Sequence, residues 1–442
     1  MNKVSLIMPS LNVAPYIEEC IKSAVNQTLQ DIEIICVDAG SDDGTLDIIE
    51  KYTFLDRRIK LIISPVKSYG AQVNQGIEIS TGEYIGVLET DDYIDKNMLE
   101  SLYETAKKHN LDYVKADYTR FFTLNNGKRF YEPIKQFYDN NNLYNRVINP
   151  SKEDILYKWD ANFWRGIYKK QFLTDNHIKF NESPGAAYQD IAFKEKILFN
   201  ATHVYYMDKP FYYYRTDRES ASTYSINALH NAWLEFFSME NIVDCGNDIY
   251  LRGHYIYMVI VFVCEYRNTL IRCGYDANKP ECSRYFWWFT SRIKKALENE
   301  YIAYSDFTKD VVEELELLVS DLDKYVELIR YKNENISKLA LELNRLSVKR
   351  IVVFGAGHWG KEIIKSIERK VLNASIMAFV DNSNKLQGKD IAGIPILSLD
   401  ESIKLFPDIS YIVANEKYSD EISEQLLDSG ISRNKIFRIF IR

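Results

Sequence analysis

The sequence has little of what a fibrous, disordered or disulfide-rich chain needs. It carries 18 glycines and 10 prolines among 442 residues, too few for a collagen-like or low-complexity chain. Its six cysteines form no Cys-x-x-Cys pair, which predicts free thiols and a cytoplasmic location. The longest apolar run, Tyr255–Cys264, has ten residues and is too short to span a bilayer.

Positive charge is also in deficit. Lysine and arginine number 55 against 63 aspartates and glutamates, which gives a net charge of −8. A nucleic-acid-binding chain usually has the opposite balance, so we expect no nucleic-acid partner. An anionic substrate then needs a local binding site, and a divalent metal ion can complete such a site.

What is present falls into three parts, and a chain of 442 residues allows two or three domains. Over residues 1–225, short apolar strands alternate with helical segments, which predicts an α/β fold with a parallel, doubly wound, Rossmann-like sheet. Residues 226–347 are helical, and Val311–Arg345 is a long amphipathic stretch. Residues 348–442 return to strand and helix signals and predict a small C-terminal Rossmann-like α/β domain.

Carboxylates follow two of the predicted strands. Asp38 ends one apolar strand, and Glu89 and Asp91 follow another. Ligands of parallel sheets bind at the carboxyl ends of the strands, so these side chains are candidates for a shared site. Carboxylates there can bind a base or ribose, or hold Mg²⁺ or Mn²⁺ against phosphates. The competing interpretation is that such residues cap turns and helices, which weighs most for Asp42 and Asp43.

A series of ordered motifs over roughly residues 1–220 carries a resemblance. The motifs are Val4-Ser-Leu-Ile-Met-Pro-Ser-Leu-Asn12, Gln27-Thr28, Ile34-Ile-Cys-Val-Asp38, Gly40-Ser41, Asp43-Gly44-Thr45, Asn74-Gln-Gly76, Gly82-Glu-Tyr-Ile85 and Asp91-Asp92. Together they resemble the family 2 glycosyltransferases of the GT-A fold. The resemblance implies an inverting, hexosyltransferase-type enzyme that uses a nucleotide-diphosphate sugar, usually a UDP-sugar. The implied acceptor is a hydroxyl of a glycan or lipid-linked acceptor in bacterial surface polysaccharide synthesis.

The resemblance also implies roles for single residues. Asp38 would bind the base, Pro9 and Asn12 would line the nucleotide pocket, and Asp91 would hold Mg²⁺ or Mn²⁺. The remaining residues that we expect at the nucleotide are Asp43, Asn74, Glu89, Thr90 and Arg215.

Asp190 is the candidate general base, because sugar transfer needs a carboxylate that takes the proton of the acceptor hydroxyl. It precedes the predicted helix Ile191–Phe199, so a helix-capping role is the alternative and is compatible with catalysis. Trp159 and Trp164 are candidates to stack on an acceptor sugar, although such residues more often pack in a core.

Some positions depart from the family pattern. Ala39 and Glu89 stand where aspartate is usual, Val73 where arginine is frequent, and Leu11 where tyrosine is frequent. Glu89 keeps a carboxylate but moves it outward by one methylene, so either ribose or the metal is open as its partner. These departures leave a non-catalytic protein that binds sugar nucleotides, or a scaffold, as an alternative function.

The C-terminal part holds a second candidate site. Gly355-Ala-Gly-His-Trp-Gly360 follows a predicted strand, opens a helix and precedes Asp381, which fits a dinucleotide fingerprint. Gly355, Gly357, Gly360 and Asp381 are its candidate residues. Further motifs, Phe379-Val-Asp-Asn382, Gly388 and Gly393-Ile-Pro395, look like the small nucleotide-sugar-binding domain that precedes some bacterial sugar acyltransferases. A nucleotide-binding module, an assembly domain and an NAD-dependent oxidoreductase all remain open.

The middle region carries no chemical motif. Its aromatic segments Tyr255–Cys264 and Tyr285–Phe289 predict the core of a helical bundle. The alternative is a surface that rests on the inner face of the cell membrane, near a lipid-linked acceptor. Homo-oligomerisation is open.

Overall fold

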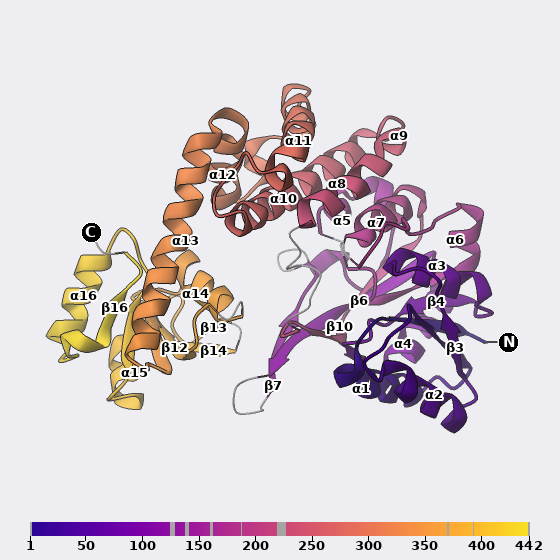
Figure 1. Cartoon of the computed structure of the whole chain (residues 1–442), viewed down its shortest axis with the longest axis horizontal. Helices are drawn as coiled ribbons and strands as arrows, with labels where there is room; N and C mark the ends of the chain where they lie inside the picture. Colours follow the sequence, from indigo (N-terminus) through magenta and orange to yellow (C-terminus); the bar gives the residue numbers. More distant parts are fainter. Residues whose placement is uncertain are drawn as a thin grey trace. The chain divides into compact units, whose positions relative to one another are not determined.

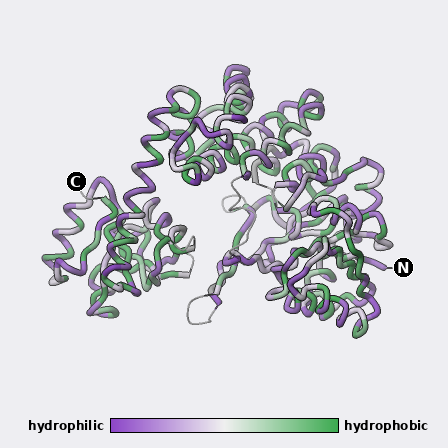
Figure 2. Tube along the Cα trace, viewed as in Figure 1, coloured by the Kyte–Doolittle hydropathy of each residue, from purple (hydrophilic) through white to green (hydrophobic). Residues whose placement is uncertain are grey.

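The computed structural model describes residues 2–123, 129–137, 141–159, 162–186, 188–218, 227–368, 371–391 and 393–440. The contacts within the chain define two compact units, Met1–Tyr325 and Val326–Arg442. In both units the buried hydrophobic residues come from strands and from the inward faces of helices, and Figure 2 shows green and purple segments alternating along the chain.

The first unit is built on a ten-stranded mixed sheet (Figure 1). Its strands are β1 (Val4–Ser10), β2 (Ile32–Asp38), β3 (Ile59–Ile63), β4 (Tyr84–Val87), β5 (Tyr93–Ile94), β6 (Tyr113–Thr123), β7 (Arg129–Ile134), β8 (Val147–Ile148), β9 (Gly166–Lys169) and β10 (Val204–Arg215). They follow the order β3-β2-β1-β4-β9-β6-β10-β5, and β7 and β8 pair with β6 and β10. Strands β1 to β4 pair in parallel, whereas β9 is antiparallel to both β4 and β6.

Helices connect and cover these strands. They are α1 (Ala14–Val25), α2 (Thr45–Leu55), α3 (Tyr69–Ile79), α4 (Met98–His109), α5 (Asp154–Trp159), α6 (Lys170–Asp175) and α7 (Gln189–Asn200). Every residue of β1 and β2 is buried, as expected of parallel strands that are covered on both faces. Helix α3 approaches β1 closely at Gly76, where a Cβ atom would lie 2.6 Å from Ile7 Cγ2. The predicted parallel α/β sheet is therefore confirmed, with an antiparallel extension beyond β4.

The chain changes direction across the sheet between β1 and β4. From β1 it continues outward through β2 and β3, and it then returns to the other side of β1 to form β4. At such a switch point the loops after the two neighbouring strands diverge and leave a crevice at the strands' carboxyl ends. The Thr90 hydroxyl donates a hydrogen bond to the Pro9 carbonyl oxygen at 2.9 Å and joins the two loops there.

The helical segment contains α8 (Ala228–Ser238), α9 (Glu240–Val243), α10 (Asp248–Arg272), α11 (Pro280–Glu298), α12 (Lys309–Ser320) and α13 (Leu322–Arg345). The amphipathic stretch Val311–Arg345 is two helices, because Asp321 leaves the helical conformation between α12 and α13. Its carboxylate accepts a hydrogen bond from the Lys324 N–H, as helix-capping residues do. Among the described residues, no helix combines the length and apolar character that a membrane crossing requires.

The second unit is a smaller α/β sheet. Its strands are β11 (Arg350–Phe354), β12 (Ser375–Val380), β13 (Asp390–Ile391), β14 (Ile394–Leu397), β15 (Ser410–Val413) and β16 (Ile436–Arg438), and its helices are α14 (His358–Glu368), α15 (Leu399–Leu405) and α16 (Ser419–Asp428). The order β13-β14-β12-β11-β15-β16 contains five parallel strands in the Rossmann order. This confirms the α/β class predicted for the C-terminal part.

The contacts group the helical segment with the first sheet rather than apart from it. Only the part of α13 from Val326 onward belongs to the second unit, where Ile336, Leu339 and Leu343 join the core of the C-terminal sheet. The three-part division at 225/226 and 347/348 stays a prediction, and its first boundary falls in 219–226, outside the described residues.

Candidate active site

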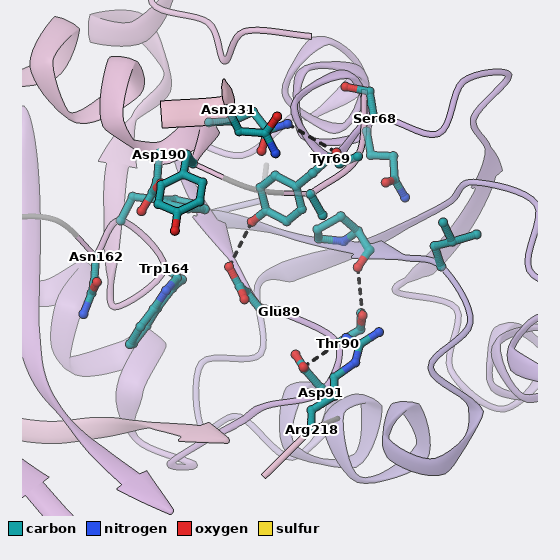
Figure 3. A pocket seen from close by; sticks show the side chains of 18 of the residues that line it. Ser68, Tyr69, Glu89, Thr90, Asp91, Asn162, Trp164, Asp190, Arg218 and Asn231 are labelled. Carbon is teal, nitrogen blue, oxygen red and sulfur yellow. Dashed lines mark hydrogen bonds and ion pairs between the residues drawn. The ribbon is translucent and has the colours of Figure 1, made fainter. Parts of the chain in front are cut away.

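A cavity of about 840 Å³ lies at the switch point of the first sheet (Figure 3). Of the residues predicted from the sequence, it brings together Pro9, Glu89, Thr90, Asp91, Asp190 and Arg215. Asn12, Asp38, Asp43 and Asn74 are not among its lining residues.

An acidic cluster forms the floor of the cavity. Carboxylate oxygens of Glu89, Asp91 and Asp92 all lie within 4.8 Å of one another. Asp92 is buried and already bonded, since it accepts hydrogen bonds from the Tyr212 hydroxyl at 2.9 Å and the Arg215 N–H at 2.7 Å. Asp92 thus fastens the end of β10 to the loop after β4, and Glu89 and Asp91 face the cavity (Figure 3).

The cluster is electrostatically strained. Burial and the charges of Asp91 and Asp190 raise the pKa of Glu89 to about 8. Burial and the charges of Asp91 and Glu89 also raise the pKa of Asp92 well above its usual range. A divalent cation would relieve this repulsion, and oxygen-only ligands are those that Mg²⁺ and Mn²⁺ prefer. The donor set therefore fits the predicted metal ion, and the carboxylates of the cluster that line the cavity are those of Glu89 and Asp91.

Two arginines contact Asp91, and only one was predicted. Arg215 is 8 % exposed, donates from Nε to the Asp91 carbonyl oxygen at 2.8 Å, and lies between the rings of Tyr16 and Phe121. Arg218 instead forms an ion pair with the Asp91 carboxylate, with Nη1 3.0 Å from Oδ2. Arg218 lies three residues beyond Arg215 in the chain, and the resemblance pointed to Arg215 because a tyrosine precedes it.

Asp190 is the second residue of α7 and points into the cavity (Figure 3). The helix is entered through Tyr188, which has a φ of +70°. Burial raises the pKa of Asp190 to about 6, although the cations of Lys194 and Lys115 oppose the rise. A carboxylate with this pKa is ionised at neutral pH and can accept a proton, as a general base must.

Asp38, which we expect at the nucleotide base, shapes a loop beside the cavity. Asp38 is fully buried, and its carboxylate accepts hydrogen bonds from both Ser10 and Ser41 hydroxyls and from the N–H groups of Gly40 and Ser41. Ser10 itself lines the cavity, so Asp38 contacts the site through its neighbour.

Asn12 and Asp43 hold the same loop. Asn12, with a φ of +52°, accepts a hydrogen bond from the Asp42 N–H, and its own N–H donates to the Ser41 hydroxyl. Asp43 accepts hydrogen bonds from Ala14 and Thr45 at the starts of α1 and α2.

Asn74 ties α3 to a distant segment. Its side chain exchanges hydrogen bonds with the Phe180 backbone and donates to the Glu182 carboxylate. It thereby positions the chain that leads to Asp190.

Sequence reasoning missed a further set of lining residues. Tyr69 donates from its hydroxyl toward Glu89 at 3.4 Å, and Asn162, Asn231 and Tyr257 line the wall near Asp190. Trp164 lines the cavity but is 5 % exposed and stacks on Tyr214, as a core aromatic does. The side chain of Trp159 lies outside the described residues.

The glycine turn of the second unit is closely packed. A Cβ atom on Gly355, at a φ of +118°, would lie 2.6 Å from the Ala414 carbonyl oxygen, and one on Gly360 would overlap the Gly355 carbonyl oxygen. Gly357 has open space around it. Asp381 accepts hydrogen bonds from the N–H groups of Ala356 and Ser383, so its carboxylate holds the turn.

An acid-lined cavity at the switch point of a mixed α/β sheet is the arrangement of a GT-A-type glycosyltransferase. The family model described as "Glycosyl transferase family 2" matches residues 5–194, and the chain belongs to that family. A second family model, "C2185-like, N-terminal", matches residues 347–437.

Relatives and solved structures agree with this assignment. The chain is 29 % identical over 289 residues to the uncharacterised glycosyltransferase EpsJ of Bacillus subtilis, covering 60 % of this chain and 79 % of EpsJ. It is 30 % identical over 251 residues to the cholesterol galactosyltransferase of Borreliella burgdorferi, covering 54 % and 67 %. The crystal structure of S. aureus TarS with UDP-GlcNAc shares the fold, with a TM-score of 0.56 at 20 % identity over 75 % of this chain and 92 % of that one.

Proposed function

We propose that the protein is an inverting, metal-assisted hexosyltransferase that moves a sugar from a UDP-sugar to a hydroxyl of a glycan or lipid-linked acceptor. The proposed setting is the synthesis of bacterial surface polysaccharide at the inner face of the membrane. The observation that carries the proposal is that one cavity holds both the Glu89–Asp91 carboxylates and Asp190, which has a pKa of about 6. An acid cluster for the diphosphate and a separate base for the acceptor are the two parts that sugar transfer needs.

The proposed reaction is a single displacement. Asp190 takes the proton from the acceptor hydroxyl as that oxygen attacks the anomeric carbon from the face opposite the diphosphate. The bond from the anomeric carbon to the phosphate oxygen breaks, and the electron pair leaves with UDP. The configuration at the anomeric carbon is therefore inverted.

The diphosphate needs positive charge, which this acidic protein supplies locally. Glu89 and Asp91 would hold Mg²⁺ or Mn²⁺, which neutralises developing charge on a leaving diphosphate. Arg218 reaches the Asp91 carboxylate from the side of the cavity and is a further candidate for the phosphates. Arg215 is held by Glu19, Asp217 and two rings, so we assign it to positioning the acidic loop.

The proposal is tested by thermal shift and by release of UDP. A panel of nucleotide sugars, each with and without Mn²⁺, should stabilise the protein most when both a UDP-sugar and the metal are present. Asp190→Asn should keep this stabilisation and lose sugar transfer by about 10²–10⁴-fold. Stabilisation by UDP-sugars together with undiminished transfer in Asp190→Asn would remove Asp190 from the mechanism. Binding without any turnover would favour the non-catalytic alternative.

For the second unit, we propose a module that binds a nucleotide or nucleotide sugar. The Rossmann strand order and the glycine turn after β11 support it. Since Asp381 is engaged by the turn, the NAD-dependent alternative has less support. The test is a titration of the full chain, in a variant whose cavity in the first unit no longer binds nucleotide sugars. Binding of UDP-sugars would support the nucleotide-sugar module, and binding of NAD would support the oxidoreductase.

We also propose that the protein contacts a membrane surface and that it self-associates. Tyr255–Cys264 lies within α10 and is largely buried, whereas Trp287 on α11 is 75 % exposed. Liposome flotation of the wild type and of Trp287→Ser tests membrane contact. Light scattering tests self-association.

A further inference from the structure

The cavity has a wall that does not come from the sheet. Asn231 of α8 and Tyr257 and Val261 of α10 line it together with Asn162. In Figure 3, Asn162, Trp164 and Asp190 lie on one side of Glu89, whereas Thr90 and Arg218 lie on the other. The helical segment, which carries no motif of its own, thus completes the cavity around the base.

This wall is fixed to the helix that carries Asp190. On α7, Lys194 follows Asp190 by one turn and places Nζ 3.1 Å from the centroid of the Tyr257 ring. The next residue, Glu195, is buried and lies 3.2 Å from Nδ1 of His254 on α10. These contacts set the distance between Asp190 and Tyr257, because they join two adjacent residues of α7 to two residues one turn apart on α10.

A second anchor holds α8. The buried Glu235 of α8 accepts a hydrogen bond from Asn181 Nδ2 at 2.9 Å, and Asn181 also donates to the Ser238 hydroxyl. Asn181 lies in the segment that Asn74 fastens to α3. Asn231, one turn before Glu235, is therefore held in place relative to both α3 and α7.

From this placement we infer that the wall formed by Asn162, Asn231 and Tyr257 is the acceptor site, and that the acceptor is a neutral saccharide. The inference rests on the proposed function and names its second substrate. An asparagine amide both donates and accepts, so it matches a sugar hydroxyl, which does the same. Tyr257, whose ring Lys194 covers on one face, lines the same wall, and an aromatic ring beside such amides suits the apolar face of a pyranose.

Two other acceptor classes fit this wall less well. A sterol offers one hydroxyl and would leave the asparagine amides without partners, which is costly in a closed site. A polyol phosphate needs cations, and Arg120, one of the cations that line the cavity, is already paired with Glu132 at 2.5 Å. The proteins named for cholesterol and poly(ribitol-phosphate) are relatives of this chain, so both classes belong in the test.

The test uses the full chain and two readouts. Saturation-transfer NMR in the presence of UDP and Mn²⁺ measures binding of methyl glycosides of common hexoses, of cholesterol in micelles and of ribitol phosphate. UDP release with octyl glycosides as acceptors then gives the acceptor KM. We expect the glycosides to bind, and we expect Asn231→Ala and Tyr257→Leu each to raise the acceptor KM at least tenfold. The Kd for UDP should stay within twofold.

Matched controls lie outside the cavity. Tyr255→Leu changes the same residue type on α10, and Asn335→Ala changes an asparagine of α13 that bonds to the Tyr331 carbonyl. Both should leave the acceptor KM unchanged, and Tyr257→Phe should keep most of the affinity. Absence of glycoside binding, preference for cholesterol or ribitol phosphate, or an unchanged KM in both wall variants would overturn the inference. Absence of UDP release with every nucleotide sugar would instead refute the proposed function.

Discussion

Arg218 Nη1 lies 3.0 Å from Asp91 Oδ2. An arginine is thus paired with the carboxylate that we propose as a metal ligand. The pair is partly buried, with side chains 22 % and 17 % exposed. A metal ion that binds Asp91 would meet the positive charge of this guanidinium, and the two cations would repel each other. Once displaced, the guanidinium carries the charge that a diphosphate requires.

The first prediction concerns this repulsion. Arg218→Gln should bind Mn²⁺ more tightly than the wild type when no nucleotide is present, because the repelling cation is gone. The same variant should bind UDP-sugar about tenfold or more weakly, since a charge-assisted hydrogen bond contributes about 1.5–3 kcal/mol. Calorimetry with Mn²⁺ alone and with UDP-sugar measures both effects. If Arg218→Gln raised both affinities or lowered both, Arg218 would not exchange Asp91 for the diphosphate.

The second prediction concerns the metal itself. Asp91→Asn should lose most of the Mn²⁺-dependent part of UDP-sugar binding, because one of the two cavity-facing carboxylates of the cluster is gone. Removal of metal with EDTA should bring the wild type to the same level. Glu89→Asp, which shortens the ligand by one methylene, should retain metal binding. Equal UDP-sugar affinity with and without EDTA would exclude a metal at this cluster.

The third prediction is a pH profile. Asp190 acts as a base only when ionised, and its pKa is about 6, raised by burial. The value of kcat/KM should therefore rise about tenfold per pH unit below pH 6 and level off above it. Lys194→Gln removes a cation that lowers this pKa, so its rising limb should move to higher pH. An identical profile in wild type and variant would show that another group titrates.

Much of the candidate site is predictable because its signals are local. Apolar strands and the acids that follow them are recognised within a few residues, and Glu89 and Asp91 after β4 and Asp190 at the start of α7 all line one cavity. Their roles stay predictions. The sheet order then brings the ends of β1 and β4 together.

The rest depends on contacts between distant parts of the chain. Asn74 meets Phe180 across 106 residues, and Arg215 meets Glu19 across 196, so neither partner is visible from the motif. The wall from α8 and α10 was missed for the same reason. Its residues belong to no local motif, and they reach the cavity only because contacts such as that of His254 with Glu195 hold α10 against α7. Asp38 is a different case. Its motif predicts that it binds the nucleotide base, whereas in the structure its carboxylate accepts four hydrogen bonds from neighbouring residues of β1 and of its own loop.

The last prediction separates structure from binding in the glycine turn of the second unit. Gly360→Ala places a Cβ atom against the Gly355 carbonyl oxygen and should destabilise this unit by about 1–3 kcal/mol, because a fixed backbone atom must shift. Gly357→Ala meets nothing within 4 Å and should leave the unfolding midpoint nearly unchanged.

If a nucleotide lies against this turn, however, the new methyl of Gly357→Ala blocks the close approach of its phosphates. Urea unfolding measures the stability of the two variants, and titration with UDP-sugars and NAD measures ligand binding by Gly357→Ala. Equal stability of the two variants would contradict the packing seen at Gly360, and unchanged ligand binding in Gly357→Ala would remove the turn as a phosphate site.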